Sequence, residues 1–182
     1  LWMKADQPIM RGCSTPFLNL NSLTVNEIPP PGPGSLLLAP NLEFLKLSYG
    51  VDWEVPRPTH GLEYMLSPGG ILGPIRALKG LYLSRIPLSN GAQANYCTYY
   101  LGFHPTIESL HLSGYELPKD FLELMLQPAD GTSDLLPNLK RLDLYNCGRE
   151  GPPEDWFVEL TRLRPSLVIN CSRRFGTVWP KS

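Results

Sequence analysis

Three histidines, four cysteines and two pairs of neighbouring carboxylates are the side chains of this 182-residue chain that could support catalysis or bind a metal. His111 stands between two leucines, on the solvent side of an expected strand, whereas His60 and His104 lie in turn-like segments. The chain has no HExxH, GxSxG, GKS or GKT motif, and no GxGxxG follows an expected strand. The histidines and glycines therefore indicate no catalytic or phosphate-binding motif.

The carboxylate pairs Asp120/Glu123 and Glu154/Asp155 could act as a general acid and base, but both fall on exposed faces of expected helices. Charge at a helix end explains such pairs more simply than catalysis does. The four cysteines have no CxxC motif and no metal-ligand spacing, which is typical of reduced thiols in an intracellular protein. They are Cys13, Cys97, Cys147 and Cys171. We expect no catalytic residue, no cofactor and no metal; a hydrolase or transferase with a site assembled from distant residues is the least favoured class.

The composition fits one domain, residues 1–182, with 42% hydrophobic residues and a formal net charge of −1. A nearly neutral chain does not complement a phosphate backbone, so we expect no nucleic-acid partner. No run of about 18 apolar residues occurs, and the first residues do not form a signal peptide. We therefore expect an intracellular protein, cytoplasmic or nuclear, with no membrane contact. Because the chain starts at Leu1, we also expect a fragment that lacks its N-terminal part.

An irregular repeat runs through the chain, with the pattern L-x-x-L-x-L in which Ile or Val can replace Leu. It occurs five times, and its central leucines are 22, 36, 29 and 32 residues apart. These leucines are Leu23, Leu45, Leu81, Leu110 and Leu142. Leu139 to Cys147 fits the longer template L-x-x-L-x-L-x-x-[NC] at every fixed position, and a degenerate sixth unit begins at Leu167. The pattern predicts an α/β leucine-rich-repeat solenoid of about five to six repeats.

The alternation within each unit predicts a short strand with one buried face. Such strands stack in parallel and share one core, and parallel strands need crossovers of about a dozen residues or more. Apolar residues at helical spacing predict crossover helices from Pro118 to Gln127 and from Pro153 to Arg164. A shorter helical piece is expected from Tyr96 to Phe103, and a Pro- and Gly-rich loop from Pro29 to Pro40. The parallel sheet would line the concave side, with helices and loops on the convex side.

The units resemble the leucine-rich-repeat region of F-box proteins, particularly the divergent ones of fungi, and Leu139 to Gly148 (LKRLDLYNCG) is the clearest match. The resemblance covers roughly Asn19 to Cys171. It implies a substrate receptor of an SCF-type ubiquitin ligase, whose repeats bind the substrate and whose F-box binds the ligase adaptor subunit. This sequence contains no F-box, so the adaptor is a partner only if an F-box lies upstream. A leucine-rich-repeat scaffold or sensor unrelated to ubiquitin is the alternative.

Between the buried positions, each strand points alternate side chains out of the sheet. These outward positions are Ser22, Thr24 and Asn26, then Phe44, Lys46 and Ser48, then Gly80, Tyr82 and Ser84, then Ser109, His111 and Ser113, and finally Arg141, Asp143 and Tyr145.

Since neighbouring strands lie about 4.8 Å apart, Lys46, Tyr82, His111 and Asp143 should form a row across the sheet. Interface hot spots are rich in Tyr and Arg, which predicts a protein partner anchored by Phe44, Tyr82, Arg141 and Tyr145. We expect the partner also to contact Lys46, His111 and Asp143 in the central row. The alternative is that Phe44 and Tyr82 only cover the sheet. Asn146 and Asn170 follow the expected strands, where they either bridge neighbouring backbones or act as turn residues.

Overall fold

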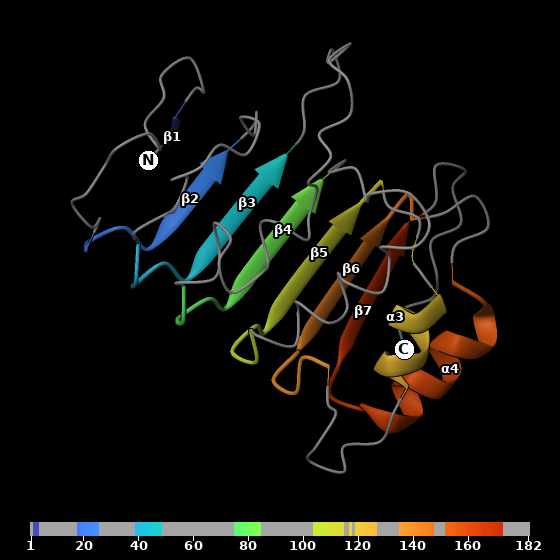
Figure 1. The fold of residues 1–182 in the computed structure, drawn as a ribbon. Helices are drawn as coiled ribbons and strands as arrows, with labels where there is room; N and C mark the ends of the chain where they lie inside the picture. Colours follow the sequence, from blue (N-terminus) through green and yellow to red (C-terminus); the bar gives the residue numbers. More distant parts are fainter. Residues whose placement is uncertain are drawn as a thin grey trace.

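The computed structural model describes residues 2–3, 18–25, 39–48, 75–84, 104–114, 117, 119–126, 135–147 and 152–172. Within these ranges, seven β-strands form one parallel sheet in which the strand order follows the chain order (Figure 1). The strands are β1 (Trp2–Met3), β2 (Ser22–Val25), β3 (Phe44–Ser48), β4 (Gly80–Ser84), β5 (Ser109–Ser113), β6 (Arg141–Tyr145) and β7 (Val168–Ser172). The expected α/β class with a parallel sheet is confirmed.

The central leucines of the five repeats form one column in the core. Each is paired with its counterpart on the next strand, from Leu23 through Leu45, Leu81 and Leu110 to Leu142. All five are 4% exposed or less, so the predicted burial and register are confirmed. A second buried column, from Leu47 to Leu144, runs beside the first through β3 to β6. Burying a leucine side chain contributes roughly 1.5–3 kcal/mol, so these columns are the main source of stability in the sheet.

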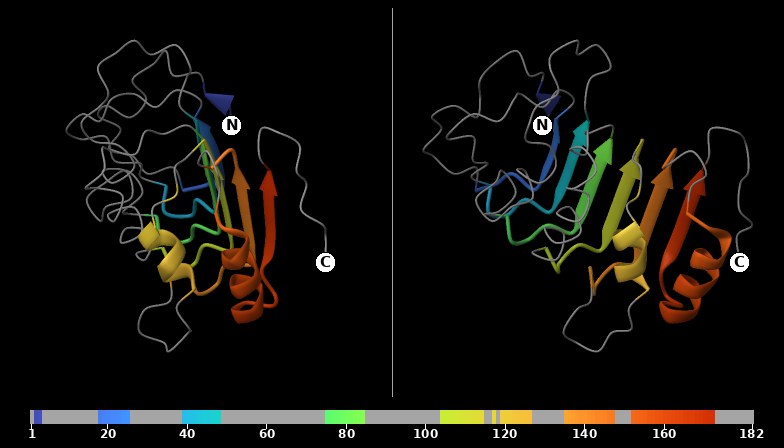
Figure 2. Two further views of the ribbon diagram at one scale, coloured as in Figure 1. Left: turned by 90° about the vertical axis from the view of Figure 1, so that its right-hand side faces the viewer. Right: turned by 45° about the vertical axis from the view of Figure 1, so that its right-hand side comes forward.

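Two helices cover the leucine side of the sheet near its C-terminal strands, as the views in Figure 2 show. α3 (Lys119–Met125) buries Phe121 and Met125, and α4 (Glu154–Leu163) buries Trp156 and Leu160. The indole Nε1 of Trp156 donates a hydrogen bond of 2.8 Å to the backbone oxygen of Leu122 and so joins α4 to α3. Both helices lie inside the ranges expected from the sequence. Among the helices in the described residues, none has the length and apolar character that a membrane crossing requires.

The sequence predicted β7 only as a degenerate repeat and did not predict β1. The degenerate sixth unit is β7, whose Ile169 pairs with Leu142, so that unit is confirmed as a strand. β1 was not predicted, and it pairs with β2 through Trp2 and Met3. The expected helical piece from Tyr96 to Phe103 lies outside the described residues, as does the expected loop before Ala39.

Polar side chains just ahead of β3, β5 and β6 tie each of these repeats to the one before it. Asn41 Nδ2 donates to the backbone oxygen of Leu18 at 2.8 Å, and Asn138 Nδ2 donates to that of Pro105 at 2.9 Å. Thr106 occupies the position equivalent to Asn138 in the preceding repeat. Its Oγ1 donates to the backbone oxygen of Leu78 at 2.8 Å. These bonds satisfy carbonyl groups outside the ladder and help to hold the strand register.

A row of alternating charge crosses the sheet at the residue that precedes each of the strands β3 to β6. Lys79 Nζ lies 2.7 Å from Glu43 Oε1, and Lys140 Nζ lies 2.8 Å from Glu108 Oε2. The backbone amide of Glu108 also bonds to the oxygen of Lys79, so the four residues are consecutive neighbours. Hydrogen bonding to Glu43 raises the pKa of Lys79, and hydrogen bonding to Lys140 lowers the pKa of Glu108. We call these four residues the charge row.

Candidate functional site

The side of the sheet opposite the leucine columns, which we call the open face, carries three rows of side chains. The first row is Ser22, Phe44, Gly80, Ser109, Arg141 and Val168. The central row is Thr24, Lys46, Tyr82, His111, Asp143 and Asn170. The third row is Ser48, Ser84, Ser113, Tyr145 and Ser172. Every outward residue predicted from the sequence lies in these rows except Asn26, which is outside the described residues.

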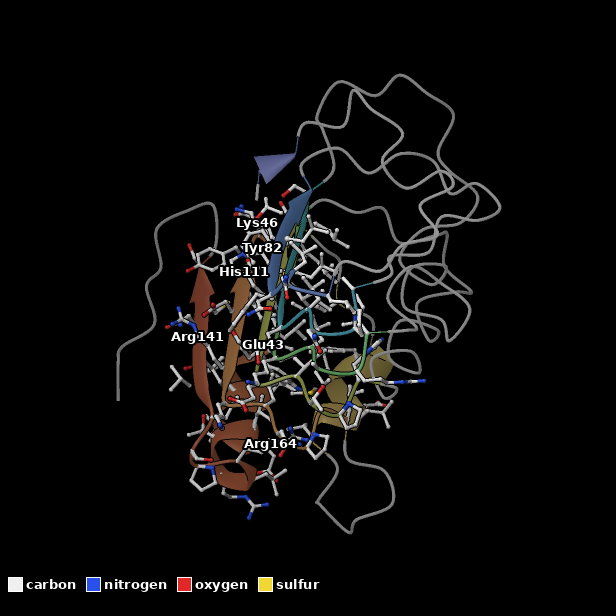
Figure 3. All side chains as sticks on the ribbon, turned by 90° about the vertical axis from the view of Figure 1, so that its left-hand side faces the viewer. Glu43, Lys46, Tyr82, His111, Arg141 and Arg164 are labelled. Atoms are coloured by element: carbon white, nitrogen blue, oxygen red, sulfur yellow. The ribbon has the colours of Figure 1, made fainter. Side chains whose placement is uncertain are left out.

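Aromatic rings from the central and third rows, Tyr82, His111 and Tyr145, are stacked face to face between neighbouring strands. Figure 3 shows Lys46, Tyr82, His111 and Arg141 on one side of the sheet. The ring centroids of Tyr82 and His111 are 3.8 Å apart at 15°, and those of His111 and Tyr145 are 4.8 Å apart at 20°. Lys46 Nζ covers the other side of the Tyr82 ring, 4.4 Å from its centroid. We call Tyr82, His111 and Tyr145 the ring stack. Because both faces of Tyr82 and of His111 are covered, these two rings offer their edges, and not their faces, to a partner.

Asp143 lies almost buried beside His111 and is held by hydrogen bonds from two neighbours, Arg141 and Asn170. Arg141 Nε donates to both of its carboxylate oxygens, at 2.9 and 3.0 Å, and Asn170 Nδ2 donates to Oδ1 at 2.6 Å. His111 Nδ1 is 3.6 Å from Oδ2, too far for a good hydrogen bond. A buried carboxylate needs such partners, and this one raises the pKa of Arg141 in return.

The exposure of the two charged residues separates their roles. The Asp143 side chain is only 9% exposed, whereas the Arg141 side chain is 55% exposed. Asp143 was predicted as a contact residue together with Arg141. In the structure the carboxylate orients the guanidinium, and Arg141 is the member of the pair that a partner can reach.

His111 sits in an environment that favours its neutral form. Its Nε2 is buried and has no hydrogen-bond partner among the described residues. Burial lowers the pKa of His111 below 6.5, with smaller contributions from the positive charges of Lys46 and Arg141, while Asp143 opposes the shift. At neutral pH the imidazole is therefore an uncharged spacer in the ring stack.

Acidification should destabilise the chain through His111. The unfolded chain binds this proton with a pKa near 6.5 and the folded chain only at lower pH, so protonation stabilises the unfolded state first. We expect the free energy of unfolding to fall as the pH drops below 6.5 and to level off below the folded pKa. His111→Phe keeps a ring in the stack without the titration. Urea unfolding at several pH values should give a flatter curve for the variant; parallel curves for the two proteins would contradict this.

A hollow opens on the open face beside Phe44. It has a volume of about 180 Å³ and is lined by Ser22, Leu23, Thr24, Phe44, Leu45, Lys46, Gly80, Leu81, Tyr82 and Ser109. A methyl group added at Gly80 would lie 2.6 Å from Cδ1 of Phe44, so the ring rests directly on the glycine backbone. Phe44 is nevertheless 49% exposed. Phe44 therefore covers part of the sheet, because its ring lies over Gly80, but about half of the residue remains exposed to solvent.

Sequence reasoning placed Gly80 on this face but missed the hollow, and it did not extend the face to β7. Asn170 lies within β7 and does not follow a strand, and among the described residues its side chain bonds the carboxylate of Asp143. Asn146, by contrast, follows β6 with a positive φ of 52°, as a turn residue does. The degenerate repeat at Leu167 could have revealed Val168 and Asn170, because its register places both on the open face.

Within the described ranges, no group of three or more His, Cys, Asp or Glu side chains is arranged to hold a metal ion. The chain matches no protein-family model, no curated protein and no solved structure. The open face and the repeat are therefore the features of the chain that bear on its function.

Proposed function

We propose that this chain is a leucine-rich-repeat solenoid that binds a protein partner on the open face of its sheet. The repeat supports the fold, because each L-x-x-L-x-L unit coincides with one strand and consecutive units are neighbours in the sheet. Side-by-side stacking of such units gives an extended surface that depends little on the loops between strands.

The observation that carries the binding proposal is that Lys46, the ring stack and Arg141 contact one another or their neighbours across the open face and are held in place by these contacts. Tyr82 and Tyr145 are each held by a stacked ring, and Arg141 is held by the buried carboxylate of Asp143. Side chains that are already ordered lose less conformational entropy when a partner binds. Tyr and Arg are also the residues most enriched in interface hot spots.

Within this function, we propose substrate recognition for an SCF-type ubiquitin ligase, on the strength of the resemblance of the repeats to those of F-box proteins. Affinity purification of the full-length protein, followed by mass spectrometry, tests this role. Recovery of the ligase adaptor subunit together with a further protein would support it. Recovery of partners without the adaptor would favour the alternative, a scaffold or sensor unrelated to ubiquitin.

Alanine at Tyr82 or at Arg141 should weaken binding of the recovered partner by at least about 1 kcal/mol each. Tyr82→Ala should change the thermal stability little, whereas Arg141→Ala removes a partner of the buried Asp143 carboxylate and should lower it. Circular dichroism at the assay temperature checks that both variants are folded. Titration calorimetry with the purified partner measures the loss, and Arg162→Ala on the exposed side of α4 is the matched control. If Tyr82→Ala and Arg141→Ala bind normally while Arg162→Ala does not, the partner binds the helical side.

A further inference from the structure

We propose that the hollow beside Phe44 seats an apolar side chain of the partner and that Lys46 binds a carboxylate next to it in the partner's chain. This inference rests on the proposed function of the open face and specifies the chemistry of the segment that binds there. The partner's anchor is then a large apolar residue with Asp or Glu close to it in sequence.

The shape and lining of the hollow fit one apolar side chain. Its volume is about 180 Å³, and an enclosed apolar cavity of about 150 Å³ already accepts a benzene molecule. The Phe44 ring forms one wall, and Gly80 leaves its floor without a side chain. Ser22 and Ser109 are too short to fill the space. An apolar group seated there would cover the exposed ring of Phe44 and release water from it.

The charge at the edge of the hollow is positive and is not neutralised within the open face. Lys46 lines the hollow and has no acidic partner among the described residues. The described open face carries two cations, Lys46 and Arg141, against one carboxylate, Asp143, which Arg141 already binds. Asp143 lies three strands away from Lys46, or about 14 Å at the usual strand spacing. That separation exceeds the Debye length of about 8 Å at physiological salt. The complementary group on a partner is therefore an anion.

The test selects peptides from a displayed library of random sequences against the whole chain, and the enriched peptides are then synthesised. We expect them to share a large apolar residue with Asp or Glu within two positions. Lys46→Glu should weaken their binding roughly fivefold or more, since it turns an attraction into a repulsion. Replacing the peptide's acidic residue with Lys should restore binding to Lys46→Glu. Arg162→Glu makes the same change of net charge on α4 and should have no effect.

A second variant tests the hollow without changing any charge. In Gly80→Ala the new methyl group meets the Phe44 ring at 2.6 Å, so the ring must swing and the hollow changes shape. We expect weaker binding of the same peptides. Ser84→Ala is the control, because it adds no volume and lies on the same strand outside the hollow. Circular dichroism should show both variants folded.

The outcomes separate this inference from the function on which it rests. Peptides that respond to Tyr82→Ala and Arg141→Ala, but not to Lys46→Glu or Gly80→Ala, would overturn the anchor and leave the open face as the binding surface. Peptides that respond to none of the four substitutions, or a library that yields no binder, would count against both.

Discussion

Replacing Leu110 with alanine is expected to lower the free energy of unfolding by roughly 2–5 kcal/mol. Leu110 is fully buried on β5, and its partners in register are Leu81 on one side and Leu142 on the other. Removing three carbon atoms there loses the transfer free energy of the side chain and leaves a cavity. The close-packed columns on both sides limit how far that cavity can collapse.

Urea unfolding followed by circular dichroism measures this loss, with the slope of the transition as a check that the cooperativity is unchanged. Ser113→Ala is the matched control because it lies on the same strand but on the open face, and it should shift the stability by less than about 0.5 kcal/mol. A loss for Leu110→Ala no larger than that of the control would mean that the proposed repeat register is wrong.

Replacing Trp156 with alanine should cost about 3–5 kcal/mol. Trp156 is the large side chain that α4 buries, and its indole also donates the hydrogen bond to Leu122 that joins α4 to α3. Trp156→Phe distinguishes the two contributions in part, since it keeps a six-membered aromatic ring and loses both the hydrogen bond and the five-membered ring of the indole. The Phe variant should lose only about 0.5–1.5 kcal/mol for the bond, together with a small packing loss.

The loss of Trp156 should also be local. In a stack of repeats each unit contacts mainly its neighbours, so opening at one end need not open the other. Hydrogen exchange should show lost protection in α4 and β7, with the amides of β3 and β4 much less affected. Equal loss of protection in all strands would show that the sheet unfolds as a single unit.

The register of the sheet was predictable from the sequence because it depends on a pattern within each unit. An alternating L-x-L segment has only one buried face, and a slip by one residue would expose every leucine of that strand. Leu81, Leu110 and Leu142 therefore align through the pattern alone. The same argument placed Lys46, Tyr82, His111 and Asp143 side by side on the opposite face.

What the sequence could not show depends on contacts between strands and on missing volume. Asp143 looks like an exposed strand residue, and its burial arises only when Arg141 and Asn170 close around it. The hollow is lined by residues of β2, β3, β4 and β5, and the Phe44 ring that forms one wall lies against Gly80, which is far from it in sequence. β1 is only two residues long, too short for any periodic signal.

The charge row also constrains how a chain of this kind can change length. Its signs alternate from Glu43 through Lys79 and Glu108 to Lys140, one residue per repeat. Deleting the repeat of β4 would place Glu43 beside Glu108, and deleting that of β5 would place Lys79 beside Lys140; like charges on neighbouring strands are destabilising. Deleting both of these repeats would bring Glu43 beside Lys140 and so keep opposite charges in contact. Within β4 and β5, loss of the two repeats together should therefore be better tolerated than loss of either one alone.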